Sequence, residues 1–202
     1  MNNMENPENF YIVAIGLSAG GMEALQDLLL HLPPVPGAAF VAVSHLLPDR
    51  ESRLDKLLTN WTSMRVGWIQ TGDAPTPNCL HLLSLGKVLT LNDGKFVLRD
   101  RNPEEKINRA ITTFFTSLAG QVQNRAIGVI LSGTGADGVE GVKAIEAQGG
   151  IVMVQDPESA RFQGMPANVI SKDHPDVIST PRQLARALMN HLTIPPFQAQ
   201  SQ

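Results

Sequence analysis

Short, continuously apolar runs recur along the chain, and most of them are followed by a segment with helical spacing. The runs cover residues 11–15, 38–43, 65–69, 126–131 and 151–154. Apolarity without alternation is typical of strands that are buried on both faces, as in a parallel sheet covered by helices. The sequence therefore predicts an α/β protein with a mostly parallel sheet.

Three helices beyond the one that follows the first run can be placed from the spacing of apolar residues and from Pro and Gly at the ends. One is expected from Pro103 to about Gly120, one over about 138–148, and one from Pro181 to about His191. Between the runs over 65–69 and 126–131, residues 87–98 alternate in polarity and turn around Asp93-Gly94, which is a hairpin signal. We expect this hairpin to add antiparallel strands to the sheet.

Length and composition indicate one globular domain. The chain has 202 residues, of which 43% are hydrophobic and 17% charged. We expect a tail over 1–10, a folded domain over 11–194 and a second tail over 195–202. The net charge of -3 gives no basic surface for nucleic acid.

Targeting and metal-binding signals are missing from the sequence. The N-terminus is polar, and no apolar stretch reaches the roughly 18 residues of a membrane helix. We therefore expect a cytoplasmic protein without membrane insertion. Cys79 is the single cysteine, which excludes an internal disulfide, and no histidine has a partner at metal-ligand spacing. No metal is expected, and the sequence gives no indication of the oligomeric state.

The segment Gly16-Leu17-Ser18-Ala19-Gly20-Gly21 lies between the first apolar run and a helix-like segment. A serine in the pattern G-x-S-x-G between a strand and a helix is a candidate nucleophile elbow, because the glycines allow a sharp turn and the helix start can face a developing oxyanion. A phosphate-binding turn would look similar, and Ser18 alone could also be the N-cap of the helix.

A catalytic serine needs a base, and the base needs an acid that orients it. His45 follows the second apolar run, and Asp137 follows the run over 126–131. Because the carboxyl ends of parallel strands share one edge, Ser18, His45 and Asp137 are expected to meet there. Taken singly, each has a plainer interpretation: His45 as a structural hydrogen-bonding residue, and Asp137 as the cap of the helix that follows it. Together they favour a triad.

These residues resemble the catalytic domain of the CheB-type chemoreceptor methylesterases. Four segments carry the resemblance: Ile15 to Gly21, Val43-Ser44-His45-Leu46, Leu131-Ser132-Gly133-Thr134-Gly135-Ala136-Asp137-Gly138, and residues 154–160 with Gly164-Met165-Pro166. The forms of residues 46–49 and 154–160 are most similar to the variant that is fused to methyltransferase and sensor modules.

The resemblance implies a three-layer α/β/α domain over 11–194 in which Ser18 is the nucleophile, His45 the general base and Asp137 the orienting acid. It also implies an oxyanion hole made by backbone N–H groups near Ala19 and Thr134. The chain departs from the family in having Thr134 where Met is usual and in the segments 80–87 and 106–109. Because the first apolar run starts at residue 11, no receiver domain is expected before it.

The function that this resemblance implies is hydrolysis of glutamate methyl esters on a methylated chemoreceptor or a receptor-like helical protein, without a cofactor. Deamidation of glutamine at the same site needs the same triad, and the sequence does not separate the two reactions. A non-catalytic receptor-docking domain of the same fold is a further alternative, as is nucleotide binding at residues 16–21. The latter is weakened because no acidic residue ends the second apolar run.

Overall fold

A computed structural model describes residues 10–44, 54–102, 104–105 and 107–193. Seven of its strands form one sheet in the order β3-β4-β2-β1-β7-β8-β9, and every pair in it is parallel. The strands of this sheet are β1 (Ile12–Gly16), β2 (Ala39–Val43), β3 (Arg65–Trp68), β4 (Cys79–Leu82), β7 (Ala126–Ile130), β8 (Ile151–Gln155) and β9 (Val177–Ser179). The predicted α/β class with a mostly parallel sheet is confirmed.

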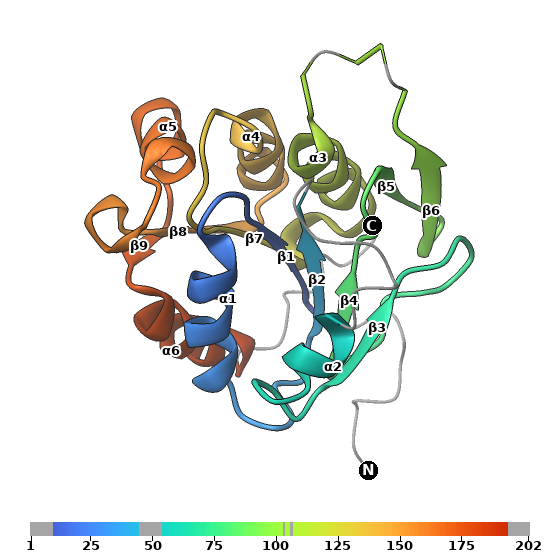
Figure 1. Ribbon diagram of the computed structural model, residues 1–202, viewed down its shortest axis with the longest axis horizontal. Helices are drawn as coiled ribbons and strands as arrows, with labels where there is room; N and C mark the ends of the chain where they lie inside the picture. The colour runs from blue at the N-terminus through green and yellow to red at the C-terminus, as the bar shows by residue number, and fades with distance from the viewer. Residues whose placement is uncertain (1–9, 45–53, 103, 106, 194–202) are drawn as a thin grey trace, which may run out of the picture.

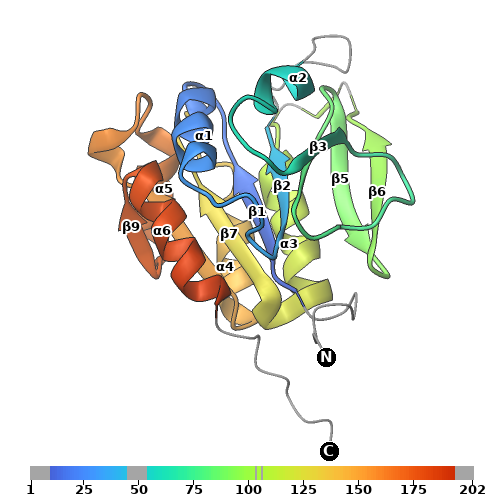
Figure 2. The ribbon, with the colours of Figure 1, turned by 90° about the horizontal axis from the view of Figure 1, so that it is seen from below.

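Helices cover both faces of this sheet (Figures 1 and 2). On one face pack α3 (Ala110–Val122), α4 (Val139–Ala147) and α5 (Gly164–Lys172), and on the other pack α1 (Gly21–Leu30), α2 (Leu54–Leu58) and α6 (Pro181–Leu192). The layers follow from the side-chain period of a strand: Ile12 and Ala14 of β1 enter one core, whereas Val13 and Ile15 enter the other. The central strands β1, β2 and β7 are buried throughout, as their continuous apolarity predicts.

The chain reverses its direction of travel across the sheet between β1 and β7. From β1 it passes through α1 to β2 on one side, and from β7 it passes through α4 to β8 on the other side. The three central strands end level with one another, because Gly16 pairs in register with Val43 and with Ile130. Such a switch point is where open α/β sheets bind their ligands, outside the carboxyl ends of the strands.

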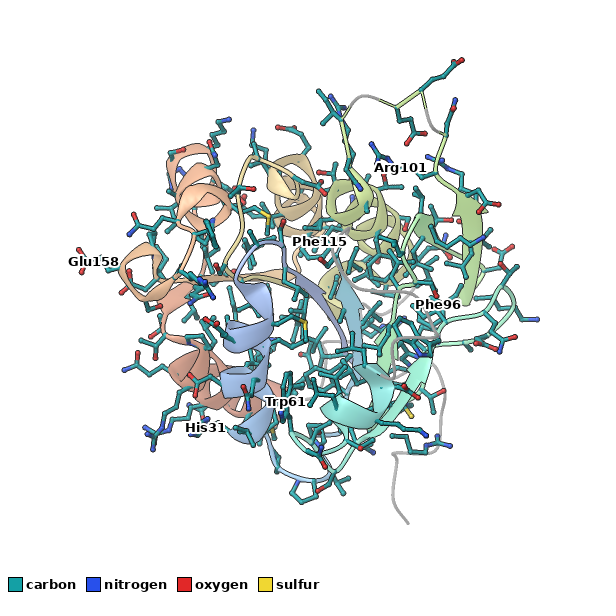
Figure 3. All side chains as sticks on the ribbon, in the orientation of Figure 1. His31, Trp61, Phe96, Arg101, Phe115 and Glu158 are labelled. Carbon is teal, nitrogen blue, oxygen red and sulfur yellow. The ribbon has the colours of Figure 1, made fainter. Side chains whose placement is uncertain are left out.

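The predicted hairpin is present as β5 (Lys87–Asn92) and β6 (Lys95–Asp100), which pair antiparallel. It forms a separate two-stranded sheet. The expectation that it adds antiparallel strands to the main sheet was therefore wrong. Its apolar face packs on α3: Leu89, Leu91 and Phe96 are buried with Phe114 and Phe115, and the side chain of Ser117 accepts a hydrogen bond from the backbone of Leu91. Figure 3 shows the aromatic rings of Phe96 and Phe115 among the packed side chains on this side of the sheet.

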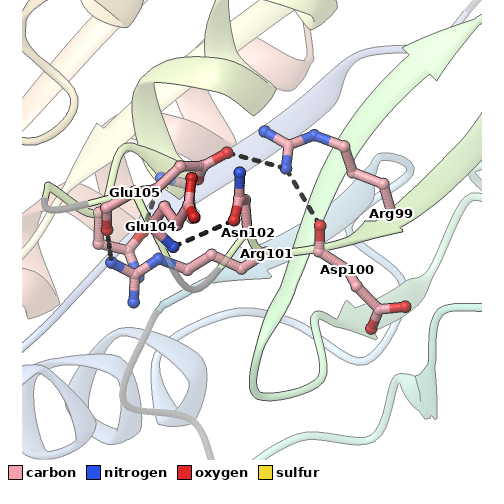
Figure 4. Close-up of polar contacts among 8 residues, drawn as sticks. Arg99, Asp100, Arg101, Asn102, Glu104 and Glu105 are labelled. Atoms are coloured by element: carbon pink, nitrogen blue, oxygen red, sulfur yellow. Dashed lines mark hydrogen bonds and ion pairs between the residues drawn. The ribbon is translucent and has the colours of Figure 1, made fainter.

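The helix expected to start at Pro103 begins instead at Ala110, and Ile107 is 66% exposed. Polar side chains hold the segment before it (Figure 4): Arg99 pairs with Glu105 at 3.1 Å, Arg101 donates to the carbonyl of Glu105, and Asn102 accepts from the backbone of Glu104. These contacts favour a turn, because an Asn side chain that bonds to the backbone two residues further on competes with helix formation.

The remaining helices and strands were in part predicted from the sequence and in part not. The two other placed helices are confirmed as α4 and α6, and the strands end within a residue or two of their predicted bounds. The short strands β4 and β9 and the helix α5 were not predicted. Two 3-10 turns, η2 (Gln123–Arg125) and η3 (Pro157–Ser159), complete the assigned elements. In the described ranges, no helix has the length and apolarity needed to cross a membrane.

Candidate active site

Ser18 lies in the tight turn between β1 and α1, at the switch point of the sheet. Its backbone N–H donates to the carbonyl of Ser132 at 3.0 Å, and its carbonyl accepts from Gly21 at 2.9 Å. Helix α1 starts at Gly21, and its N-cap is Gly20 with φ 69°. Ser18 is therefore not the helix cap that the plainer interpretation allowed.

The loop after β7 packs directly against this turn (Figure 1). A Cβ placed on Gly133 would lie only 3.0 Å from the Cβ of Ser18, and 2.7 Å from the sulfur of Met165. Glycine at position 133 therefore lets the loop approach the serine closely. Ser18 itself is 5% exposed.

Asp137 lies at the same edge of the sheet, in the loop that leaves the neighbouring strand. Its Oδ2 accepts from the backbone N–H of Ile111 and its Oδ1 from that of Thr112, both at 3.0 Å. The positive end of α3 thus holds the carboxylate. Asp137 does cap a helix, but not the next one: α4 has Gly138 as its N-cap. A carboxylate has about four acceptor positions, so two remain for a further donor.

Ile111 links the two halves of the site. A Cβ on Gly16 would lie 2.7 Å from the Cγ2 of Ile111, and one on Gly138 would lie 3.0 Å from the same atom. The start of α3 is therefore wedged between the end of β1 and the residue after Asp137. This packing fixes the carboxylate relative to the strand that leads to Ser18.

The two proposed oxyanion donors belong to the turn of Ser18 and to the loop that packs against it. The backbone N–H groups of Ala19 and Thr134 donate to no acceptor in the part of the chain that the structure describes. The N–H of Ala19 shares a peptide group with the carbonyl of Ser18, which accepts from Gly21 at 2.9 Å, and the N–H of Thr134 shares one with the carbonyl of Gly133, which accepts from Met165 at 2.9 Å. Two fixed backbone donors beside a serine are what an oxyanion hole requires.

His45 lies outside the described residues, so its predicted role as the base stays a prediction. Of the other histidines, His81 accepts from the backbone of Thr76, and burial lowers its pKa. His31 bonds to the carbonyl of Asp27, and His191 packs edge-on against Tyr11. The contacts of these three histidines are with residues other than Ser18. Within the ranges that the model describes, no group of His, Cys, Asp and Glu could hold a metal ion.

Ser132 and Gln155 hold the site together, although neither of them had a predicted role. The fully buried Ser132 receives the N–H of Ser18 on its carbonyl and that of Phe162 on its hydroxyl. Gln155, 2% exposed, accepts the N–H of Ser132 at 2.8 Å and donates to the carbonyl of Ser159. The only sequence signal for these two was their place in the conspicuous segments 131–138 and 154–160.

We expect Gln155→Leu to destabilise the protein by about 1–3 kcal/mol, because it leaves the buried N–H of Ser132 without an acceptor. Any activity should fall by roughly tenfold or more, since the carbonyl that holds Ser18 moves with Ser132. Thermal unfolding and a rate measured well below the melting temperature separate the two effects. Ser159→Ala, which removes only an exposed hydroxyl that Gln155 also contacts and leaves the acceptor of Ser132 in place, serves as the matched control. Equal stability of all three proteins would contradict this role.

A hollow of about 470 Å³ begins at the same turn and extends along α1. Its lining comes from Gly20, Glu23, Ala24, Asp27, Gln155, Ser159, Ala160, Arg161, Thr180 and Pro181. Neither Ser18 nor Asp137 is part of this lining. Gly20, two residues beyond Ser18, connects the hollow with the serine turn.

Comparisons with known proteins agree with this architecture. The model of the family described as CheB methylesterase matches residues 13–188. Two relatives named protein-glutamate methylesterase/protein-glutamine glutaminase 2, from Burkholderia lata and Anaeromyxobacter dehalogenans, are 33% and 30% identical over 91% and 88% of this chain. The matches cover 55% and 52% of those relatives, so the chain spans about half of their length. The crystal structure of the Thermotoga maritima CheB methylesterase catalytic domain superimposes with a TM-score of 0.82 at 27% identity, over 90% of this chain and 98% of that one.

Proposed function

We propose that this chain, which belongs to the CheB methylesterase family, is a serine esterase that hydrolyses methyl esters of glutamate side chains in a protein substrate. The observation that carries the proposal is the position of Ser18. It is held by main-chain bonds at the switch point of the sheet, against a loop that supplies a fixed carboxylate and backbone donors without another acceptor among the described residues.

In the proposed reaction the hydroxyl of Ser18 attacks the ester carbonyl while His45 takes its proton. Asp137 orients His45 and stabilises its charged form. The negative oxygen of the tetrahedral intermediate is bound by the N–H groups of Ala19 and Thr134. The intermediate collapses to an acyl-enzyme and expels methanol, which receives the proton from His45. Water, activated by the same histidine, then releases the glutamate carboxylate.

Deamidation of glutamine by the same residues is the second candidate, because the names of the two relatives include protein-glutamine glutaminase. The acyl-enzyme is identical in the two reactions, and the first product is ammonia in place of methanol. An amide is the poorer substrate, so we expect the ester to react faster.

The proposed partner is a methylated chemoreceptor or a receptor-like helical protein, as the family resemblance implies. The cytoplasmic location stays a prediction. Because the chain spans about half the length of its curated relatives, the proposed activity and partner are assigned only to the domain that this chain contains.

The proposal is tested by incubating the protein with a helical segment that carries glutamate γ-methyl esters, and with the same segment carrying glutamine. Methanol and ammonia are measured separately. Methanol release supports the esterase, and ammonia without methanol supports the deamidase. Binding of the segment with neither product would favour a non-catalytic docking domain.

A further inference from the structure

The hollow along α1 carries one positive side chain in its lining, and this side chain lies at the end nearest to Ser18. A Cβ placed on Gly20 would meet the Cβ of Arg161 at 2.9 Å and the ring of Phe162 at 3.0 Å. Arg161 therefore packs against the turn at Gly20, which is two residues from Ser18 along the chain. Two residues span at most about 7 Å of chain, so the guanidinium is within side-chain reach of whatever flanks the reacting group.

The backbone that carries Arg161 is fixed where it meets the site. The next residue, Phe162, receives a hydrogen bond from the N–H of Gly133 on its carbonyl and donates its own N–H to the hydroxyl of Ser132. Ser132 also holds Ser18, whose N–H donates to its carbonyl. Phe162 is 40% exposed, and the guanidinium of Arg161 lies 5.9 Å from the centre of its ring. Arg161 thus extends into solvent from a rigid base.

The charge of Arg161 is only partly engaged. One of its terminal nitrogens pairs with Glu23 at 2.8 Å, and both side chains are well exposed, at 62% and 68%. A guanidinium has five N–H donors in a planar fork, so it can hold a second carboxylate beside the first. An exposed pair of this kind is weak and exchanges readily. The other carboxylate in the lining, Asp27, accepts from the backbone of Arg182.

We propose that Arg161 is a specificity-determining residue that binds a carboxylate of the substrate protein about one helical turn from the target ester. This inference rests on the proposed esterase function. Side chains one turn apart on a helix have Cβ atoms about 5–6 Å apart. Arg161 contacts Gly20, two residues from Ser18, so a substrate helix with its ester at Ser18 brings a side chain one turn away within reach of the long arginine side chain. Glu23 holds the guanidinium in the hollow and competes for it. The domain therefore selects esters that have an acidic residue beside them.

The test uses two synthetic helical peptides that each carry a single glutamate γ-methyl ester. One has glutamate one turn before and one turn after the ester, and the other has glutamine at both positions. We expect the wild-type protein to release methanol from the acidic peptide with a kcat/KM about fivefold to twentyfold higher. Arg161→Ala should remove this preference, with less than a twofold change on the glutamine peptide. The preference should also shrink as salt is raised.

Two further variants make the result specific to charge at this position. Glu23→Gln frees the guanidinium, so it should raise the preference for the acidic peptide about twofold to threefold. Arg161→Glu should prefer a third peptide that has lysine at the two flanking positions. Arg186→Ala, which removes an exposed arginine of α6 outside the hollow, is the control and should behave as the wild type.

Each result decides between the two proposals. The inference is supported if the wild type and Arg161→Ala release methanol from the glutamine peptide at equal rates. The preference for the acidic peptide must also be lost in Arg161→Ala and kept in the wild type. An unchanged preference in Arg161→Ala, or an equal loss on both peptides, overturns the inference and leaves the esterase intact. No methanol from any peptide with the wild-type protein overturns the esterase proposal and this inference with it.

Discussion

Ser18→Ala abolishes methanol release, with an expected fall in kcat of about 10⁴-fold to 10⁶-fold, as is typical when a serine nucleophile is removed. The variant has no atom that can form the acyl-enzyme. What survives is the contribution of the oxyanion donors and of substrate binding, since the N–H groups of Ala19 and Thr134 are part of the main chain.

The same substitution should leave the fold intact. The turn is held by the N–H and the carbonyl of Ser18, which alanine also has. Losing a buried hydroxyl that makes a hydrogen bond costs about 1 kcal/mol, so the melting temperature falls by only a few degrees. Circular dichroism during heating measures this alongside the methanol assay.

Labelling with a fluorophosphonate identifies the reactive serine directly. Intact mass should show one adduct on the wild-type protein and none on Ser18→Ala. Ser171→Ala is the matched control, because Ser171 is an exposed serine on α5 whose hydroxyl donates to the carbonyl of Asn168. It should be labelled and active as the wild type is. Methanol release by Ser18→Ala within tenfold of the wild-type rate would refute the nucleophile assignment.

The main sheet was predictable because its central strands are buried on both faces and are therefore continuously apolar. The elements that escaped prediction have weaker local signals. Strand β9 has three residues, none of them fully buried, and β4 has four that include Cys79 and His81. Helix α5 starts with Gly164 and contains Pro166, which are helix breakers in a local reading.

The start of α3 shows why local spacing was insufficient. The apolar stripe extends back to Ile107, so the pattern predicted a longer helix. Its first turn is instead set by Asp137, which caps it from 25 and 26 residues away. A cap supplied by another loop leaves no trace in the sequence around the helix start.

Long-range contacts also explain why some residues of the candidate site could be predicted from the sequence and others could not. Ser18 and Asp137 occur in recognisable glycine-rich segments after strands. Ser132, Gln155 and Arg161 act through contacts across 113, 23 and 138 residues of chain, and such pairings are decided by the tertiary fold. His45 lies outside the described residues, so the triad stays a prediction.

Asp137→Asn is expected to lower kcat by about 10³-fold to 10⁴-fold, because the amide cannot stabilise the charged form of the base or fix its tautomer. The substitution also affects the fold. An amide offers one acceptor oxygen where Ile111 and Thr112 present two donors, so its NH₂ group faces an N–H. We expect a loss of about 1–3 kcal/mol in the free energy of unfolding.

Thr112→Val separates the two roles of this carboxylate. The hydroxyl of Thr112 accepts the N–H of Gly138 at 2.8 Å, so valine weakens the contact between the same loop and α3 while Asp137 stays. If Asp137 is only a helix cap, both variants lose activity in proportion to the unfolded fraction and recover it on cooling. If it orients the base, Asp137→Asn stays inactive when fully folded, and Thr112→Val keeps its kcat within about threefold. A folded Asp137→Asn protein with the wild-type rate would leave the residue as a cap for α3 and nothing more.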